Sequence, residues 1–235
     1  MSFERNINAF THAPVVRDAE SMLSLILEYG IIPFFENPIP GYSVEEHTLP
    51  ECWFTDDNLG PWDWKIHCVQ SGQVAYGKFL WGGKAAFASV EFYRELMNWR
   101  RSLPRYATTD DQARILDYVD EHGAISIAEV RHLLGIKKAA ADALIARLQL
   151  QTRLVTGDIV RVYRGADLSY SGWQRSSFCT PESLFFDDAD IPFPGYHPVS
   201  ARTVHSPAES LEFLQAHIRS LCGPVAPRTL EKLLG

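Results

Sequence analysis

Two glutamines separated by one leucine, Gln149 and Gln151, are the residues whose type and spacing most clearly suggest a chemical step. A neutral amide cannot take a proton from water, but it can position a water molecule and hydrogen-bond to a sugar that develops positive charge. This chemistry is sufficient when the leaving group is already activated, as in a cationic alkylated purine of an extruded nucleotide. The pair is therefore a candidate for hydrolysis of a glycosidic bond.

Geometry sets a condition on this pair. Residues i and i+2 point about 200° apart on a helix but share one face of an extended segment. Converging glutamines thus require the preceding helix to end before Gln149. The alternative is that both are ordinary polar positions in the last turn of that helix.

Positive charge gathers in one segment of an acidic chain. The net charge is −7, so the whole molecule has no general attraction for nucleic acid or an anionic membrane. Residues 131–164 nevertheless carry seven lysines and arginines against two carboxylates. We interpret this segment as a DNA-facing surface, and the alternative is a solvated helix face or a module that binds only proteins. The candidate nucleic-acid contacts are Lys137, Lys138, Arg147, Arg153, Arg161 and Arg164.

Trp62 and Trp64 are candidates for stacking on an extruded base, because they would share a face if their segment were extended. The alternative is a packing role, which large aromatic side chains usually have.

The sequence indicates no metal or cofactor site. His47, Cys52, His67 and Cys68 are of zinc-ligand types, but their spacing matches no compact zinc signature. The four cysteines are too sparse for a disulfide framework and contain no Cys-x-x-Cys pair, so we expect reduced thiols. We expect neither a metal nor a cofactor.

The elements that must position these residues follow from apolar spacing and capping signals. Thr109-x-x-Gln112 and Ser126-x-x-Glu129 are capping boxes that open two helices, which end at Gly123 and Gly135. A third helix is expected over 137–150, and two extended segments over 154–163 and 173–178 flank a glycine-rich turn. This order predicts a winged helix-turn-helix module within residues 108–186.

The flanking regions complete an α+β fold. Residues 1–107 are expected to form a helical and antiparallel-sheet region, and residues 187–235 a C-terminal loop and helices that pack on the rest. The expected elements are a helix over 15–29, a long ordered loop over 31–64, strands over 65–69, 74–80 and 84–89, a helix over 90–101 capped by Ser89, a short helix from Thr180, a proline-rich loop over 187–205, and a helix that begins after Ser206.

The beginning of the chain lacks a basic segment followed by an apolar one, and no run of about 18 apolar residues occurs. We therefore expect a cytoplasmic protein without a membrane partner.

Two stretches resemble the AlkZ/YcaQ group of winged-helix DNA glycosylases, in particular the shorter AlkZ-related proteins. They are the segment 108–178 with its LQLQT end, and the run GPWDWK followed by SGQVAYGKF within residues 60–79. The resemblance implies excision of alkylated or crosslinked bases by a Gln-apolar-Gln motif, which would here be Gln149 and Gln151.

The sequence thus predicts a winged-helix protein that binds duplex DNA through a local basic patch. A DNA glycosylase-like activity is the more specific hypothesis. The alternative is a non-catalytic protein–protein interaction or dimerisation module, which the acidic net charge and the long aromatic loops would suit, and a homodimer belongs to that interpretation.

Overall fold

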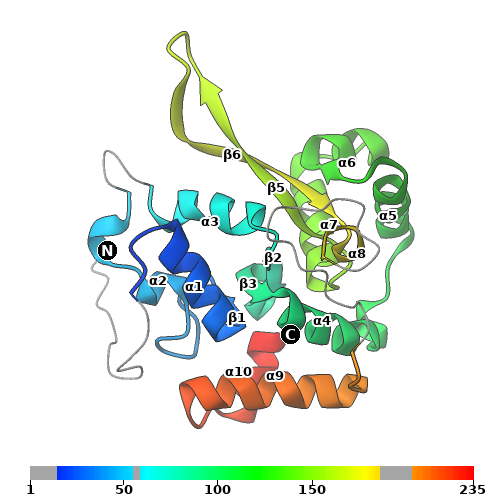
Figure 1. Ribbon diagram of the computed structural model, residues 1–235. Coiled ribbons are helices and arrows are strands. Elements are labelled where there is room, and N and C mark those ends of the chain that lie inside the picture. The colour runs from blue at the N-terminus through cyan, green and yellow to red at the C-terminus, as the bar shows by residue number, and fades with distance from the viewer. Residues whose placement is uncertain (1–14, 55–58, 186–202) are drawn as a thin grey trace.

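The computed structural model describes residues 15–54, 59–185 and 203–235. These residues form an α+β fold with two antiparallel three-stranded sheets, each covered by helices (Figure 1). Within them, no helix is long and apolar enough to cross a membrane.

The first sheet has the strand order β1-β3-β2, so β2 is an edge strand. It consists of β1 (Ile31–Pro33), β2 (Val74–Leu80) and β3 (Lys84–Ser89), and the predictions for the last two are confirmed. Helix α1 (Ala19–Tyr29) covers this sheet, and it begins where the Asp18 carboxylate accepts the Ser21 N–H at 2.7 Å. The expected start at residue 15 is wrong, because Val16 instead forms a β-bridge with Thr48.

The expected strand over 65–69 is wrong, and the expected loop over 31–64 is interrupted by regular elements. The segment contains β1, the short helix α2 (Val44–His47) and the start of helix α3 (Pro61–Gln70). Pro61 occupies the first helical position, where its fixed φ favours a helix and its missing N–H is not needed. Ile66 and Val69 then lie on one face and pack against Ile159, a helical rather than an alternating pattern.

Helix α4 (Val90–Arg101) is confirmed, although the Ser89 side chain makes no capping hydrogen bond. Helix α9 (Pro207–Cys222) begins with the predicted capping signal at Ser206 and packs along α4 (Figure 1). The other helices of this region are α8 (Pro181–Phe185), as expected, and α10 (Pro227–Leu234). Among the described residues, single 3₁₀ turns occur at Pro50–Cys52, Trp81–Gly83 and Pro104–Tyr106. Most of the predicted loop 187–205 lies outside the described residues.

Residues 110–179 form the helix–strand unit, which consists of α5 (Asp110–His122), β4 (Ile125–Ser126), α6 (Ile127–Leu134), α7 (Lys138–Leu150), β5 (Val155–Arg164) and β6 (Ser169–Cys179). Both predicted capping boxes are present. The sheet order is β4-β6-β5, and the β5–β6 hairpin projects beyond the rest of the molecule (Figure 1). The two strands reach further into the glycine-rich segment than expected, which shortens the predicted turn.

The helix–strand unit has its own core, which includes Ile115, Val130, Ile145 and Phe178. A larger core joins α1, the first sheet, α4, α9 and α10, and it also takes in Val155 and Cys179 from the helix–strand unit. The division of the chain at 107/108 and 186/187 stays a prediction.

Candidate functional site

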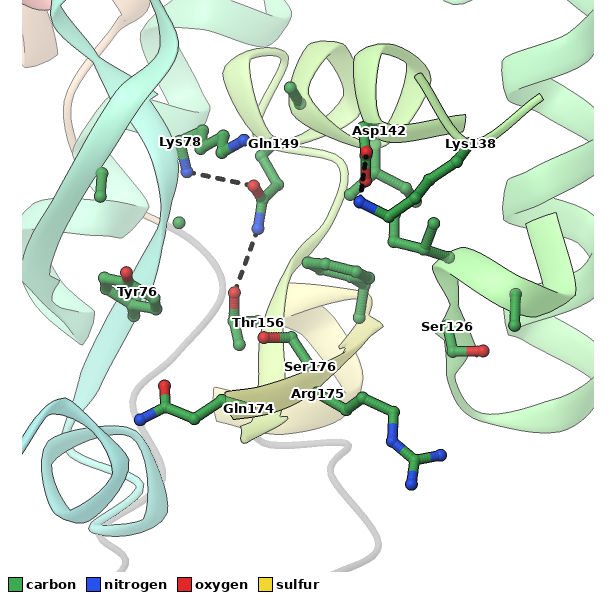
Figure 2. Close-up of a pocket in the computed structure, with 17 residues that line it drawn as sticks. Tyr76, Lys78, Ser126, Lys138, Asp142, Gln149, Thr156, Gln174, Arg175 and Ser176 are labelled. Atoms are coloured by element: carbon green, nitrogen blue, oxygen red, sulfur yellow. Dashed lines mark hydrogen bonds and ion pairs between the residues drawn. The ribbon is translucent and has the colours of Figure 1, made fainter. Parts of the chain in front are cut away.

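A cavity of about 430 Å³ lies between the edge strand β2 and the helix–strand unit (Figure 2). Strand β2, helices α6 and α7, and strand β6 provide most of its wall. The lining residues with polar side chains are Tyr76, Lys78, Ser126, Lys138, Asp142, Gln149, Thr156, Gln174, Arg175 and Ser176.

Gln149 joins the two sides of this cavity. Its Oε1 accepts the backbone N–H of Lys78 at 3.1 Å, and its Nε2 donates to Thr156 Oγ1 at 3.2 Å (Figure 2). Because β2 is an edge strand, the Lys78 N–H has no strand partner on that side, and the amide takes this role. A primary amide has two donors and two acceptor lone pairs, so Gln149 keeps one of each.

Gly77 makes the close approach of Gln149 to β2 feasible. A Cβ atom at position 77 would lie 2.9 Å from Nε2 and 3.2 Å from Cδ of Gln149. The glutamine is only 2% exposed and is held on both sides of its carboxamide, so its position in the cavity wall is fixed.

Gln151 lies elsewhere, because helix α7 continues through Leu150. The condition for converging glutamines is therefore not met. The Gln151 side chain is buried away from the cavity, where Nε2 donates to the Ala107 carbonyl at 2.9 Å and to Gln112 Oε1 at 3.1 Å. Gln151 thus ties the end of α7 to the start of α5.

The cavity wall carries three cationic side chains and one carboxylate. Lys138 and Asp142, one turn apart on α7, form an ion pair at 3.3 Å (Figure 2). Lys78 and Arg175 form no ion pair within the described part of the chain, so the lining is net positive. Burial raises the pKa of Tyr76, which keeps its hydroxyl neutral as a hydrogen-bond donor.

Gln174 adds an unused acceptor to the same wall. Its Nε2 donates to the Trp62 carbonyl at 3.0 Å and to Tyr170 Oη at 2.9 Å. Its Oε1 is buried and accepts no hydrogen bond from any described residue. Buried polar atoms are usually satisfied, so this oxygen is an exception beside the cavity.

The predicted basic residues do not form a single surface. Lys137 and Lys138 are exposed at the start of α7, and Lys138 lines the cavity. Arg147 follows Lys138 by nine residues and therefore points to the opposite side of the helix. There its Nη2 donates to the Arg105 carbonyl at 2.6 Å, and its guanidinium lies over the Tyr106 ring.

The other three predicted contacts lie in separate surroundings. Arg153 is half-buried, and burial, together with the charge of Arg101, lowers its pKa. Arg161 donates to the Asp63 carboxylate from Nε at 3.0 Å and from Nη2 at 2.7 Å. Arg164 lies near the hairpin turn, with its guanidinium 4.8 Å from the centre of the Trp173 ring.

Neither predicted stacking residue lines the cavity. Since residues 61–70 are helical, Trp62 and Trp64 do not share a face. Trp62 donates from Nε1 to the Gly172 carbonyl at 3.2 Å, and Trp64 packs against the larger core.

Sequence reasoning missed Asp142, Tyr76 and Gln174 as cavity residues. Asp142 was detectable, because it precedes Gln149 by seven residues, and that spacing places both on one face of a helix. Tyr76 and Gln174 could not be identified in this way. They line the same cavity only because β2 and β6, which belong to different sheets, face each other in the folded protein.

No group of three or more potential metal ligands occurs among the residues that the structure describes. All four cysteines are free thiols, and Cys68 and Cys179 are buried.

Comparison with known proteins gives one result that covers nearly the whole chain. The profile of the family described as AlkZ related matches residues 16–235. No curated protein and no solved structure matches at a significant level. Since the match includes the first sheet, the helix–strand unit and the C-terminal helices, the chain belongs to the AlkZ-related family.

Proposed function

We propose that this protein is a DNA glycosylase-like protein that binds DNA through a winged helix and accepts an extruded nucleobase in the cavity beside Gln149. The order helix, strand, helix, helix, strand, strand from α5 to β6 is typical of winged-helix modules, which supports the first part. Membership of the AlkZ-related family supports the relationship to glycosylases.

The observation that carries the proposal is the position of Gln149 in the wall of a cavity large enough for a base. The amide keeps one donor and one acceptor beside its two structural hydrogen bonds. With these two groups it can hydrogen-bond the edge of a flipped base. Gln149 and Gln151 were the predicted catalytic pair, and this geometry supports a direct role for Gln149 and a positioning role for Gln151.

In the excision step, a water oxygen would attack C1′ of the sugar while the bond from C1′ to the base nitrogen breaks. The electron pair of that bond goes to the base, which an alkylated cationic purine accepts readily. We assign the proton of the attacking water to Asp142, because it is the carboxylate that lines the cavity, two turns before Gln149 on the same face of α7.

We propose Lys137 and Lys138 as the phosphate contacts beside this cavity. They are exposed at the first turn of α7, where the helix dipole also favours an anion. Lys138 is 74% exposed although it pairs with Asp142. Arg147 and Arg161 are engaged by the Arg105 carbonyl and by Asp63, and Arg153 is half-buried, so the contribution of these three arginines to DNA binding is expected to be smaller.

Fluorescence anisotropy with a short duplex, with and without a central abasic-site analogue, tests this proposal. We expect salt-dependent binding that tightens on the abasic duplex. The double variant Lys137→Ala, Lys138→Ala should weaken binding and reduce the salt slope by about two. The matched control is Arg228→Ala with Lys232→Ala on α10, which should bind as the wild type does.

An excision assay on alkylated duplex separates binding from catalysis. Loss of excision in Gln149→Ala, with retained binding, would support the catalytic step, whereas binding without excision in the wild type would restrict the protein to recognition. Absence of binding at low salt would overturn the proposal. The interaction or dimerisation module would then be the better interpretation, and light scattering would test it.

A further inference from the structure

The β5–β6 hairpin presents two chemically different faces. Side chains alternate along a strand, and the exposure of β6 alternates accordingly from Ser169 to Ser176. One face, with Tyr170, Gly172 and Gln174, is turned toward α3, which lies below the hairpin in Figure 1. The other face is open to solvent.

Contacts with α3 fix the inner face. Asp63 accepts the hydroxyl of Tyr170 at 2.9 Å in addition to the two hydrogen bonds from Arg161. The Trp62 indole and carbonyl bind the Gly172 carbonyl and the Gln174 amide, respectively. The projecting hairpin is therefore held in one orientation.

The open face, which we call the Trp173 face, consists of Val160, Arg164, Trp173 and Arg175. Trp173 is 57% exposed and Val160 is 48% exposed, so this face presents apolar and aromatic surface to solvent. Arg164 stacks on the Trp173 ring, and Arg175 stands opposite Val160 in the strand register.

Charge on the Trp173 face is positive. Its two guanidinium groups form no ion pair within the described part of the chain. The carboxylates of the hairpin lie elsewhere, since Asp158 accepts a hydrogen bond from Gln70 of α3 and Asp167 lies in the turn beside Gly165.

An exposed indole between two arginines matches the chemistry of unpaired nucleotides. Bases stack on aromatic rings and phosphates bind arginine, whereas the base faces of an intact duplex are covered by their neighbours. A protein partner would more commonly meet a larger apolar surface, and on this face only Val160 and Trp173 supply one. The other exposed apolar side chains of the hairpin, Tyr163 and Leu168, lie on the inner face and in the turn.

The Trp173 face also leads to the cavity, because Arg175 belongs to both. Figure 2 shows Gln174 and Arg175 pointing to opposite sides of β6 at the cavity mouth. A strand whose nucleotide entered the cavity would have its neighbouring nucleotides within reach of the hairpin.

We propose that the Trp173 face binds a short unpaired stretch of DNA next to the nucleotide held in the cavity, with one base stacked on the side of the Trp173 ring that Arg164 does not cover and phosphates on Arg164 and Arg175. This inference rests on the proposed function and makes it more specific: the preferred substrate is DNA with unpaired nucleotides beside the target, not a fully paired duplex.

The test compares three labelled probes of one sequence in the anisotropy assay: a duplex, the same duplex with five central nucleotides unpaired in one strand, and the single strand. The wild type should bind the second probe most tightly. Trp173→Ala should weaken binding to the two probes with unpaired nucleotides about 5- to 150-fold, from about 1–3 kcal/mol per stacked base, and leave duplex binding nearly unchanged. Trp173→Phe should restore most of the loss, because it keeps an aromatic face.

Two control variants accompany this change. Tyr163→Ala removes an aromatic ring, 54% exposed, that pairs with Tyr170 of the inner face. Arg228→Ala removes an exposed arginine of α10. Circular dichroism and melting curves verify that each variant is folded. Both controls should bind all three probes as the wild type does.

The outcomes separate this inference from the proposed function. Equal binding of all probes, unaffected by Trp173→Ala, would overturn the inference and leave duplex binding intact. No binding to any probe would overturn both. Self-association in light scattering that Trp173→Ala abolishes, without an effect on DNA, would also overturn it in favour of a protein-binding face.

Discussion

At the scale of single residues, the cavity depends on one glycine and one glutamine. The Gln149 amide takes the place of a missing neighbour strand at Lys78, and Gly77 leaves the space for it. The same side chain is thus both structural and, in the proposed function, part of the substrate site.

Gly77→Ala should therefore displace Gln149. The added methyl group would lie 2.9 Å from Nε2, so the amide must move and lose its hydrogen bonds, which costs about 1–3 kcal/mol of unfolding free energy. Urea denaturation measures this loss. In the Gln149→Ala background the same substitution should be much less destabilising, and equal costs in both backgrounds would contradict a specific clash.

Lys65 is a buried lysine, and its ionisation should make the folding stability of the protein depend on pH. Its Nζ donates to the Trp62 carbonyl at 2.6 Å and lies 3.4 Å from the centre of the Trp62 ring. Burial lowers the pKa of Lys65 to about 7, against an opposing effect of Asp63. Between pH 7 and about 10.5 the unfolded chain holds a proton that the folded chain has released, so folding stability increases with pH.

Lys65→Met should therefore flatten the dependence of the melting temperature on pH between 7 and 10, and increase stability most at pH 7 and below. Melting curves at four pH values measure this. Lys232→Met, an exposed lysine of α10, is the control and should leave the dependence unchanged. A variant that kept the full slope would show that another group causes it.

At the scale of elements, α9 is attached to α4 through a buried carboxylate. Glu95 is 2% exposed and accepts the hydroxyls of Ser210 at 2.5 Å and Thr203 at 2.6 Å, with His205 Nδ1 at 3.1 Å. Burial alone would raise the pKa of Glu95, but these hydrogen bonds outweigh it and lower the pKa below 4.5.

The stability from this lowered pKa is complete above about pH 4.5 and is lost as the pH falls through the pKa of the folded state. Glu95→Gln should cost about 2 kcal/mol at pH 7, because the bonds to a charged acceptor are replaced by weaker ones. It should also lose less stability than the wild type between pH 6 and pH 3. Glu212→Gln, on the exposed face of α9, is the control, and an equal loss in both variants would contradict this role.

Local signals explain which elements could be predicted. Capping boxes at Thr109 and Ser126 provide hydrogen-bond partners for the free N–H groups at the helix starts, from side chains only a few residues away. The helices of the helix–strand unit could therefore be predicted from the sequence. Helix α3 was not, because its apolar residues Ile66 and Val69 are few and the packing against Ile159 that selects them is distant in sequence. This error also affects the candidate site, because only an extended segment would place Trp62 and Trp64 on one face.

At the scale of the whole molecule, the candidate site is a junction. Gln149 could be named from sequence, but its partners Lys78 and Thr156 come from strands of different sheets. No local sequence pattern predicts that Gln149, Lys78 and Thr156 come into contact. The convergence of Gln149 with Gln151 failed for a similar reason, because tertiary contacts to Ala107 and Gln112 hold Gln151 on the other side of α7.

Arg100 connects the same junction to the end of the chain. It is fully buried on α4 and donates to the Leu150 carbonyl at 2.8 Å, at the end of α7, and to the Leu234 carbonyl of α10. Burial lowers the pKa of Arg100 to about 10, so the guanidinium stays charged at neutral pH. Carbonyl groups from two distant segments compensate the charge of Arg100. Both segments must be in place for the buried guanidinium to be stable.

Arg100→Lys should therefore destabilise the whole molecule, because an ammonium group on a shorter stem cannot reach both carbonyls as the planar guanidinium does. We expect a loss of about 2–4 kcal/mol in one cooperative transition. Urea denaturation followed by circular dichroism and by tryptophan fluorescence measures it, with Arg228→Lys as the control. If the transitions remained coincident at a lower midpoint, α4, α7 and α10 would act as one unit. Two separate transitions would instead show that Arg100 holds together parts that can fold alone.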